Sequence, residues 1–177
     1  MTAVDPWLDE AQLTAWLSMA VLMEVFPTSV DAQLRDDLGV NRFEYSILAM
    51  LSEEPDGTLV MSDLAAVAFG SLSRLSHAVG RLETRGWLER KPGVGGRRHT
   101  TVTLTTAGRA AIEAAAPLHA AHLQRALVEP LTERELADLG RIARKLVAAN
   151  DPEMAAQLDD LIPTVIARNL GTAQDSA

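Results

Sequence analysis

Hydrophobic residues recur at helical spacing along most of this chain, which predicts a mainly α-helical protein. The first predicted helix covers residues 5–26 and is apolar nearly all the way round. Its hydrophobic positions are Leu13, Trp16, Leu17, Met19, Ala20, Val21, Leu22, Met23 and Phe26. A helix of this kind has to be covered on more than one side. Because proline has no backbone N–H, Pro27 is predicted to end the helix.

Two more helices are predicted before residue 53. One runs to about Leu38 and stops at Gly39, a residue that readily adopts the left-handed conformation of a helix end. The next covers residues 42–52, and Asn41 followed by Glu44 has the spacing of a capping box at its start. The segment EEPDG that follows is predicted to form a turn.

Two short helical patterns, over residues 62–68 and 71–85, are separated by Phe69 and Gly70 and have the spacing of a helix-turn-helix. In the second, the apolar stripe consists of Leu72, Leu75, Val79 and Leu82. The opposite face carries Arg74, His77, Ala78, Arg81 and Arg85. The periodicity therefore predicts one face that packs and one that is free to bind.

A two-stranded hairpin is predicted after Gly86, which fits a left-handed helix stop. The segments WLERK and HTTVTLT are rich in β-branched and aromatic residues, which predicts that they form strands. PGVGGRR between them forms a long, glycine-rich tip.

The rest of the chain is predicted to be helical. Thr105 can cap a helix that starts at Ala107, kinks or breaks at Pro117 and resumes to about Val128. Thr132 and Glu135 form a second capping box, and the helix after it carries a near-heptad stripe of Leu136, Leu139, Ala143, Leu146 and Val147 that needs a partner helix. A last short helix begins at Pro152 and breaks at Pro163, and residues 171–177 are expected to be a disordered tail.

Charge is distributed unevenly along the chain. The whole protein has a formal net charge of −8, yet residues 71–109 hold eight basic and two acidic residues, a local charge of +6. The remaining residues therefore carry −14. A basic island on an acidic body suits a protein that docks a polyanion with one face. The alternative is a solvated helix whose arginines pair with acidic neighbours.

Composition narrows the function classes. The chain has no cysteine, which excludes disulfides, thiolate catalysis, cysteine redox sensing and cysteine-ligated zinc. The uncharged stretch over residues 11–23 is shorter than the roughly 20 residues of a bilayer span, and no signal peptide is recognisable, so a cytoplasmic protein without a membrane partner is expected.

The segment from Met61 to Gly108, with the pattern SxSRLSHxVxRLExRGW followed by RRxxxVxLTxxG, resembles the winged-helix core of MarR-family transcriptional regulators. The likeness extends more loosely over residues 5–150. It implies a winged helix-turn-helix fold with N- and C-terminal helical dimerisation arms. The implied divisions are residues 1–40 and 109–170 for the two dimerisation arms, 41–108 for the DNA-binding domain and 171–177 for the tail.

The resemblance also implies a function: a homodimer that binds a pseudo-palindromic operator, usually as a repressor released by a ligand. DNA contacts would come from Ser71, Ser73, Arg74, His77 and Arg81 on the recognition helix and from Arg97 and Arg98 on the wing. Arginine can donate to guanine O6 and N7 and also suits a narrow minor groove. Wings of the family usually carry an acidic residue where Gly96 stands, so this wing is expected to order only on DNA.

Three other groups of residues are weaker candidates for a functional site. His119 and His122 have the spacing of metal ligands, but two surface histidines without a completing ligand are favoured, so neither a metal nor another cofactor is expected. Trp16, Met19 and Met23 could bind a small aromatic effector, although dimer core is the favoured interpretation. His99 fits a phosphate contact and a plain strand residue equally well.

Three other function classes have weaker support in the sequence. Ser76 and His77 are adjacent on a helix and point about 100° apart, so an enzyme with these residues as nucleophile and base is not expected. A protein-interaction module on a winged-helix scaffold and a metal-responsive regulator stay open as alternatives.

Overall fold

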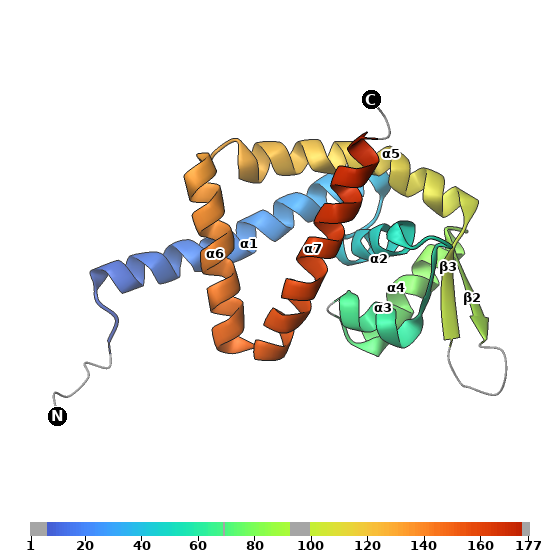
Figure 1. Cartoon of the computed structure of the whole chain (residues 1–177), viewed down its shortest axis with the longest axis horizontal. Coiled ribbons are helices and arrows are strands. Elements are labelled where there is room, and N and C mark those ends of the chain that lie inside the picture. The colour runs from blue at the N-terminus through green and yellow to red at the C-terminus, as the bar shows by residue number, and fades with distance from the viewer. Residues whose placement is uncertain (1–6, 69, 93–99, 175–177) are drawn as a thin grey trace.

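The structure is a computed structural model that describes residues 7–68, 70–92 and 100–174 (Figure 1). Its elements are α1 (Glu10–Leu38), α2 (Arg42–Glu53), β1 (Thr58–Val60), α3 (Met61–Val67), α4 (Leu72–Thr84), β2 (Leu88–Pro92), β3 (Thr100–Leu104), α5 (Thr106–Leu123), the π-helix η1 (Gln124–Val128), α6 (Glu133–Asn150) and α7 (Pro152–Gln174). The predicted fold class, mainly α-helical with a small antiparallel sheet, is confirmed.

One hydrophobic core lies where α2, α3 and α4 meet the sheet, and the last turns of α1 and the first half of α5 close it. Its fully buried large side chains are Leu34, Val40, Ile47, Leu48, Leu51, Leu64, Leu75, Val79, Leu82 and Val102. Helix α4 places one side in this core, so its other side faces solvent at the edge of the molecule (Figure 1). The core thereby fixes the orientation of the face that is predicted to bind.

Helix ends follow the local chemistry that the sequence predicts. Asn41 and Glu44 exchange both hydrogen bonds of a capping box at the start of α2, and Thr132 and Glu135 do so at the start of α6. Ser71 caps α4 by accepting a hydrogen bond from the Arg74 backbone N–H at 3.2 Å. These caps satisfy backbone donors that a helix leaves free at its start.

Pro27 and Pro163 do not end their helices as predicted, and the helix is not broken at Pro117. Helix α1 continues through Pro27 to Leu38, α5 through Pro117, and α7 through Pro163 to Gln174. A proline removes one helical hydrogen bond, but packing of the flanking turns can offset that cost. In α1 the turns after Pro27 bury Val30 and Leu34. Helix α7 also includes residues 171–174, which were expected to belong to the disordered tail.

The sheet contains a strand that the sequence pattern did not predict. β1 pairs with β3 in antiparallel register, Thr58 opposite Thr103 and Val60 opposite Thr101, and the strand order is β1-β3-β2. A three-residue strand is too short to show the alternation by which strands are recognised. The sheet therefore anchors the hairpin to the start of α3.

The predicted stripe on α4 is wrong at two positions. Leu72 is exposed and Ala78, which was assigned to the free face, is fully buried. Leu72 lies in the first turn, where the helix leaves the core, whereas Ala78 lies beside Leu75 and Val79 and packs with them. The buried side of α4 is thus centred one position away from the predicted stripe.

The arms contribute little to this core. The first half of α1 projects away from the sheet, and α6 and α7 pack against each other as a hairpin (Figure 1). Helix α6 has no buried residue, although it carries the predicted heptad stripe. The apolar faces of both arms are therefore largely uncovered in a single chain.

Candidate nucleic-acid interface

The exposed side of α4 brings together the recognition-helix residues that the resemblance implies. Ser71, Ser73, Arg74, His77 and Arg81 are all exposed, whereas Leu75, Ala78, Val79 and Leu82 on the other side are buried. The residues thus form one surface of hydroxyl, imidazole and guanidinium groups. Groups of these kinds can donate to base edges and to phosphate oxygens.

Arg74 is held in place by an aromatic ring. Its guanidinium lies over the Phe43 ring, 4.2 Å from the ring centre, and Phe43 is itself buried. Over the described residues, no carboxylate forms an ion pair with Arg74. A stacked arginine is pre-oriented and keeps donors available for an anionic partner.

The turn between α3 and α4 depends on the same ring. A Cβ atom on Gly70 would lie 2.6 Å from Cζ of Phe43, closer than side chains tolerate. Glycine at this position therefore lets the turn approach Phe43, which in turn supports Arg74. The sequence located this turn but gave no reason for its glycine.

Arg81 has an intramolecular partner that the sequence analysis missed. Its Nε donates to Glu44 Oε1 of α2, and Glu44 is buried. Glu44 Oε2 also accepts the Asn41 backbone N–H at 3.0 Å, so one carboxylate caps α2 and holds the recognition helix. The Arg81 side chain stays 57% exposed, which leaves room for a second partner.

Arg85 is not free, contrary to its assignment to the binding face of α4. Its Nη1 donates to the Leu38 carbonyl at 3.0 Å and its Nη2 to the Gly39 carbonyl at 2.6 Å, while the guanidinium lies 5.0 Å from the Trp87 ring centre. These bonds satisfy carbonyls that α1 leaves free at its C-terminus. Arg85 therefore connects α1 to α4.

Arg90 also stabilises the fold. Its Nε donates to Glu83 Oε2 at 2.7 Å and its Nη2 to the Ser76 carbonyl at 3.0 Å, so it fastens β2 to α4. The alternative of arginines that pair with their own carboxylates thus holds for part of the basic island. Arg97, Arg98, Gly96 and His99 lie outside the described residues, as does the expected ordering of the wing.

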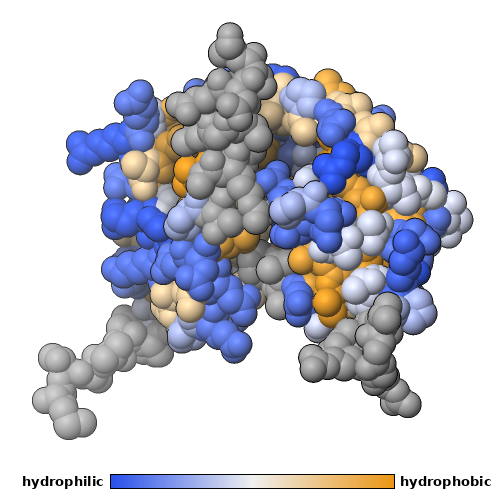
Figure 2. All heavy atoms as spheres, turned by 45° about the vertical axis from the view of Figure 1, so that its right-hand side comes forward, coloured by the Kyte–Doolittle hydropathy of each residue, from blue (hydrophilic) through white to orange (hydrophobic). Residues whose placement is uncertain are grey.

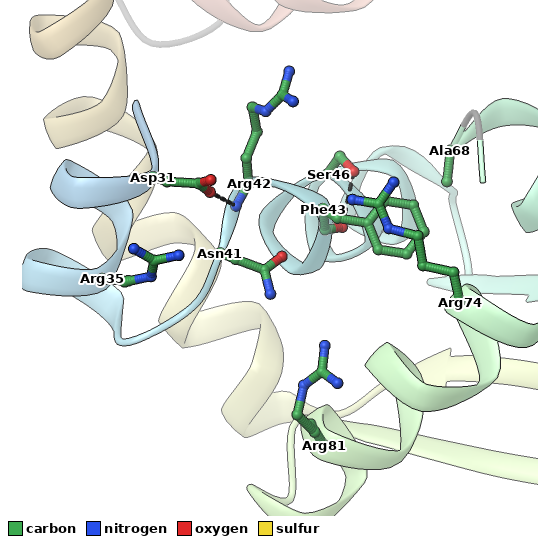
Figure 3. A pocket seen from close by; sticks show the side chains of 9 residues that line it. All are labelled: Asp31, Arg35, Asn41, Arg42, Phe43, Ser46, Ala68, Arg74 and Arg81. Atoms are coloured by element: carbon green, nitrogen blue, oxygen red, sulfur yellow. Dashed lines mark hydrogen bonds between the residues drawn. The ribbon is translucent and has the colours of Figure 1, made fainter. Parts of the chain in front are cut away.

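A cavity of about 460 Å³ opens between α1, α2 and α4 (Figure 3). Its lining consists of Asp31, Arg35, Asn41, Arg42, Phe43, Ser46, Ala68, Arg74 and Arg81. Arg74 and Arg81 reach it from α4, and Arg35 comes from α1 on the opposite side (Figure 3). Neither Arg35 nor Arg42 was predicted as a site residue, since both lie before the basic stretch and no local pattern links them to α4.

The two histidines of α5 are half-buried against α1 rather than freely exposed on the surface as expected. His119 Nδ1 lies 2.8 Å from Gln33 Oε1 and His122 Nε2 lies 3.1 Å from Ser29 Oγ, both across the contact with α1. Burial, with a smaller contribution from His122, lowers the pKa of His119 below its usual value. Within the described part of the chain, His, Asp and Glu form no group of three that could hold a metal ion.

The proposed effector residues lie on the projecting half of α1. Trp16 and Met23 are exposed and Met19 is half-buried, so they form an apolar surface rather than the wall of the cavity described above. Leu13, Leu17, Val21, Leu22 and Val25 extend the same exposed apolar surface. On the face that Figure 2 displays, hydrophobic residues reach the surface between hydrophilic ones.

Comparisons with known proteins agree on one family. The family model described as MarR family matches residues 38–99, whereas no curated protein sequence matches the chain. The structure of Sco3205 from Streptomyces coelicolor, a MarR family transcriptional regulator in complex with DNA, is 32% identical, with a TM-score of 0.78 over 84% of this chain and 96% of that chain.

AbsC, a MarR family transcriptional regulator from the same organism, is 26% identical, with a TM-score of 0.78 over 84% of this chain and 100% of that one. Wild-type MarR from E. coli is 23% identical, with a TM-score of 0.59 over 80% and 98% of the two chains, and supports the fold alone. The family model, the shared helix-turn-helix and the likeness to Sco3205 together show that this chain belongs to the MarR family of transcriptional regulators.

Proposed function

We propose that the protein is a homodimeric, sequence-specific DNA-binding regulator that represses transcription until a small ligand releases it. The observation that carries the proposal is the row of exposed polar side chains on α4, opposite a fully buried row, in a chain 32% identical to a regulator solved with DNA. The family membership supports a regulator rather than an enzyme.

The recognition helix would read the major groove. Ser73, Arg74 and His77 lie on the exposed face and can reach base edges, with arginine suited to guanine O6 and N7. Ser71 caps α4, so backbone N–H groups of its first turn point toward a phosphate at that end. Two copies of α4 about 34 Å apart would address half-sites one turn of DNA apart.

Dimerisation would use the uncovered faces of the arms. Exposed apolar side chains gather on α1, and further ones lie on α5, α6 and α7, as Leu118, Ile142, Leu146 and Ile166 show. Burial of such a surface against a second copy removes apolar area from water, which is the main driving force of stable association. This interpretation assigns Trp16, Met19 and Met23 to the dimer interface; their role in binding an aromatic effector stays a prediction.

A membrane is the competing partner for α1. This helix, near the N-terminus, is long and apolar enough to cross a bilayer by length and composition alone. However, Glu24 lies within the helix and a buried ionised carboxylate is costly in hydrocarbon. Glu24 is exposed, and a dimer interface can leave it in water, so we favour a dimer over a membrane and place the protein in the cytoplasm.

The direct test is a mobility-shift assay with the intergenic DNA next to the protein's own gene. A shift that survives excess unrelated DNA is expected from the wild type, and Arg74→Ala is expected to reduce the preference for that DNA over unrelated DNA. No binding to any duplex would overturn the proposal and favour a protein-interaction module.

Repression and ligand release need separate measurements. A reporter under the same intergenic DNA should rise in expression when the gene is deleted. A screen of small aromatic acids by thermal shift should then identify a compound that both stabilises the protein and abolishes the mobility shift.

A further inference from the structure

We propose that the cavity between α1, α2 and α4 is a phosphate-binding pocket for the DNA backbone, with Arg35 and Arg42 as contacts outside the recognition helix and the wing. The proposal rests on the proposed DNA-binding function and extends the interface beyond α4. The cavity borders Arg74 and Arg81 directly, so a duplex on α4 would pass over its mouth (Figure 3).

The charges in the cavity favour an anion. Four guanidinium groups line it, and Asp31 is the carboxylate among the lining residues. Asp31 Oδ1 accepts the backbone N–H of Arg42 at 2.6 Å rather than pairing with an arginine side chain. Among the ion pairs of the described residues, none includes Arg35 or Arg42. Arg81 is paired with Glu44, so the cations without a carboxylate partner among the described residues are Arg35, Arg42 and Arg74. Cations that outnumber the neighbouring carboxylates attract a polyanion.

The pocket is a site made of side chains rather than a helix N-terminus. Three backbone donors at the start of α2 are already used, because the Asn41 side chain accepts from the Glu44 N–H, Glu44 accepts from the Asn41 N–H and Asp31 accepts from the Arg42 N–H. We therefore assign anion binding to the guanidinium groups, which bind phosphate oxygens through two parallel hydrogen bonds.

Two features favour backbone phosphate over a small aromatic acid. A pocket for a small organic ligand is usually lined mainly by hydrophobic side chains. Here the apolar residues of the lining are Phe43 and Ala68, and Arg74 already covers the Phe43 ring. In addition, Arg74 and Arg81 belong both to this pocket and to the exposed face of α4, so one duplex can engage both surfaces.

The hydrogen-bond partners of each arginine indicate whether it serves fold stability or DNA affinity. Arg85 and Arg90 use their donors on Leu38, Gly39 and Glu83, so they contribute to stability. Arg35 and Arg42 are exposed and close to α4, so they contribute to DNA affinity. The two groups should therefore respond differently to substitution.

The experiment compares the double variant Arg35→Gln/Arg42→Gln with the control Arg125→Gln/Arg134→Gln. The control removes the same charge from exposed positions on η1 and α6, away from the pocket. Affinity for a fluorescent 30-base-pair duplex of random sequence is measured by anisotropy between 50 and 200 mM salt. Because random DNA needs no operator, the readout reports phosphate contacts alone.

Loss of two phosphate contacts should lower the slope of log affinity against log salt by about 1.8. Over the fourfold salt range, the wild type and the control should therefore lose about 12-fold more affinity than the pocket variant. Each single variant should show about half of this change in slope. Circular dichroism melts check that all variants are folded, and the single variants keep the test valid if the double variant is not.

Three results would count against the proposal in different ways. An unchanged slope in the folded pocket variant, with a wild type that binds DNA, overturns the pocket and leaves the proposed function intact. A wild type that binds no duplex overturns the proposed function itself. If benzoate or inorganic phosphate stabilises the wild type but not the pocket variant, and the DNA slope is unchanged, the cavity is a small-anion site and the proposal is wrong.

Discussion

Glu44→Gln separates the structural role of Arg81 from its proposed role in DNA binding. The Glu44 carboxylate is buried and accepts from two donors, Arg81 Nε and the Asn41 backbone N–H. A glutamine has one acceptor oxygen, and its NH₂ group would face a donor at the other position. The variant therefore keeps the shape of the side chain but loses one of its two bonds.

The expected change in the free energy of unfolding follows from the loss of one charged hydrogen bond. A hydrogen bond to a charged group contributes about 1.5–3 kcal/mol. Arg81 is 57% exposed, so water solvates its charge once Glu44 is neutral, and the lower half of this range applies. We therefore expect the free energy of unfolding to fall by about 2 kcal/mol, which lowers Tm by about 4–8 °C in a chain of this size.

DNA binding should change in the opposite direction. Without its carboxylate partner, Arg81 can rotate toward a phosphate, and the binding face gains one net positive charge. The affinity for random duplex at low salt should rise, and the salt slope should steepen by up to about 0.9 for the extra phosphate contact. Lower stability together with tighter non-specific binding is an uncommon combination, which makes the test specific.

Thermal melts by circular dichroism and anisotropy titrations on the same preparations give both quantities. Glu113→Gln is the matched control, because it removes the same charge from an exposed position on α5. A Tm equal to that of the control would show that the ion pair contributes no stability. Weaker binding to random duplex in a folded Glu44→Gln variant would refute the release of Arg81.

Three further predictions concern other parts of the molecule. Gly108→Ala places a Cβ against the Trp87 carbonyl oxygen, so it should lower the free energy of unfolding by about 1–3 kcal/mol, measured from urea denaturation. Leu17→Asp/Val21→Asp puts charges on the exposed face of α1, and light scattering should then give the 19.0 kDa monomer instead of a dimer. Burial, and secondarily a neighbouring histidine, lowers the pKa of His119 in the folded state. The contribution of His119 to stability is therefore complete at pH values above its usual pKa of 6.5 and is lost as the pH falls below that value. His119→Gln should flatten the pH dependence of the urea midpoint between pH 7.5 and 5.5, and an unchanged dependence would contradict this assignment.

The features predicted correctly from the sequence are those set by neighbouring residues. The capping box of Asn41 and Glu44 and the left-handed Gly39 and Gly86 depend on side chains and backbone within a few positions. The helix-turn-helix was also predicted correctly, because its apolar residues recur at regular helical spacing. Local chemistry of this kind acts before tertiary contacts form, so a single sequence contains it.

The features missed depend on contacts between distant segments. β1 exists because β3, about 40 residues later, pairs with it, and α1 continues through Pro27 because later turns pack on the core. The partner of Arg81 is likewise 37 residues away on α2. Periodicity placed Arg81 on the outer face correctly, but no pattern on α4 shows that Glu44 lies opposite.

The acidic body and the basic face act over different distances. The chain as a whole repels DNA, since its net charge is −8, but this repulsion is screened beyond about 8 Å at physiological salt. In the proposed complex, the guanidinium groups of Arg35, Arg42, Arg74 and Arg81 would act at contact, where screening is weak. Lowering the salt lengthens the reach of both the attraction and the repulsion, so the repulsive background grows together with the attraction. DNA binding would therefore select the orientation in which α4 and the neighbouring cavity face the duplex, and the acidic surface would contribute to specificity by disfavouring other orientations.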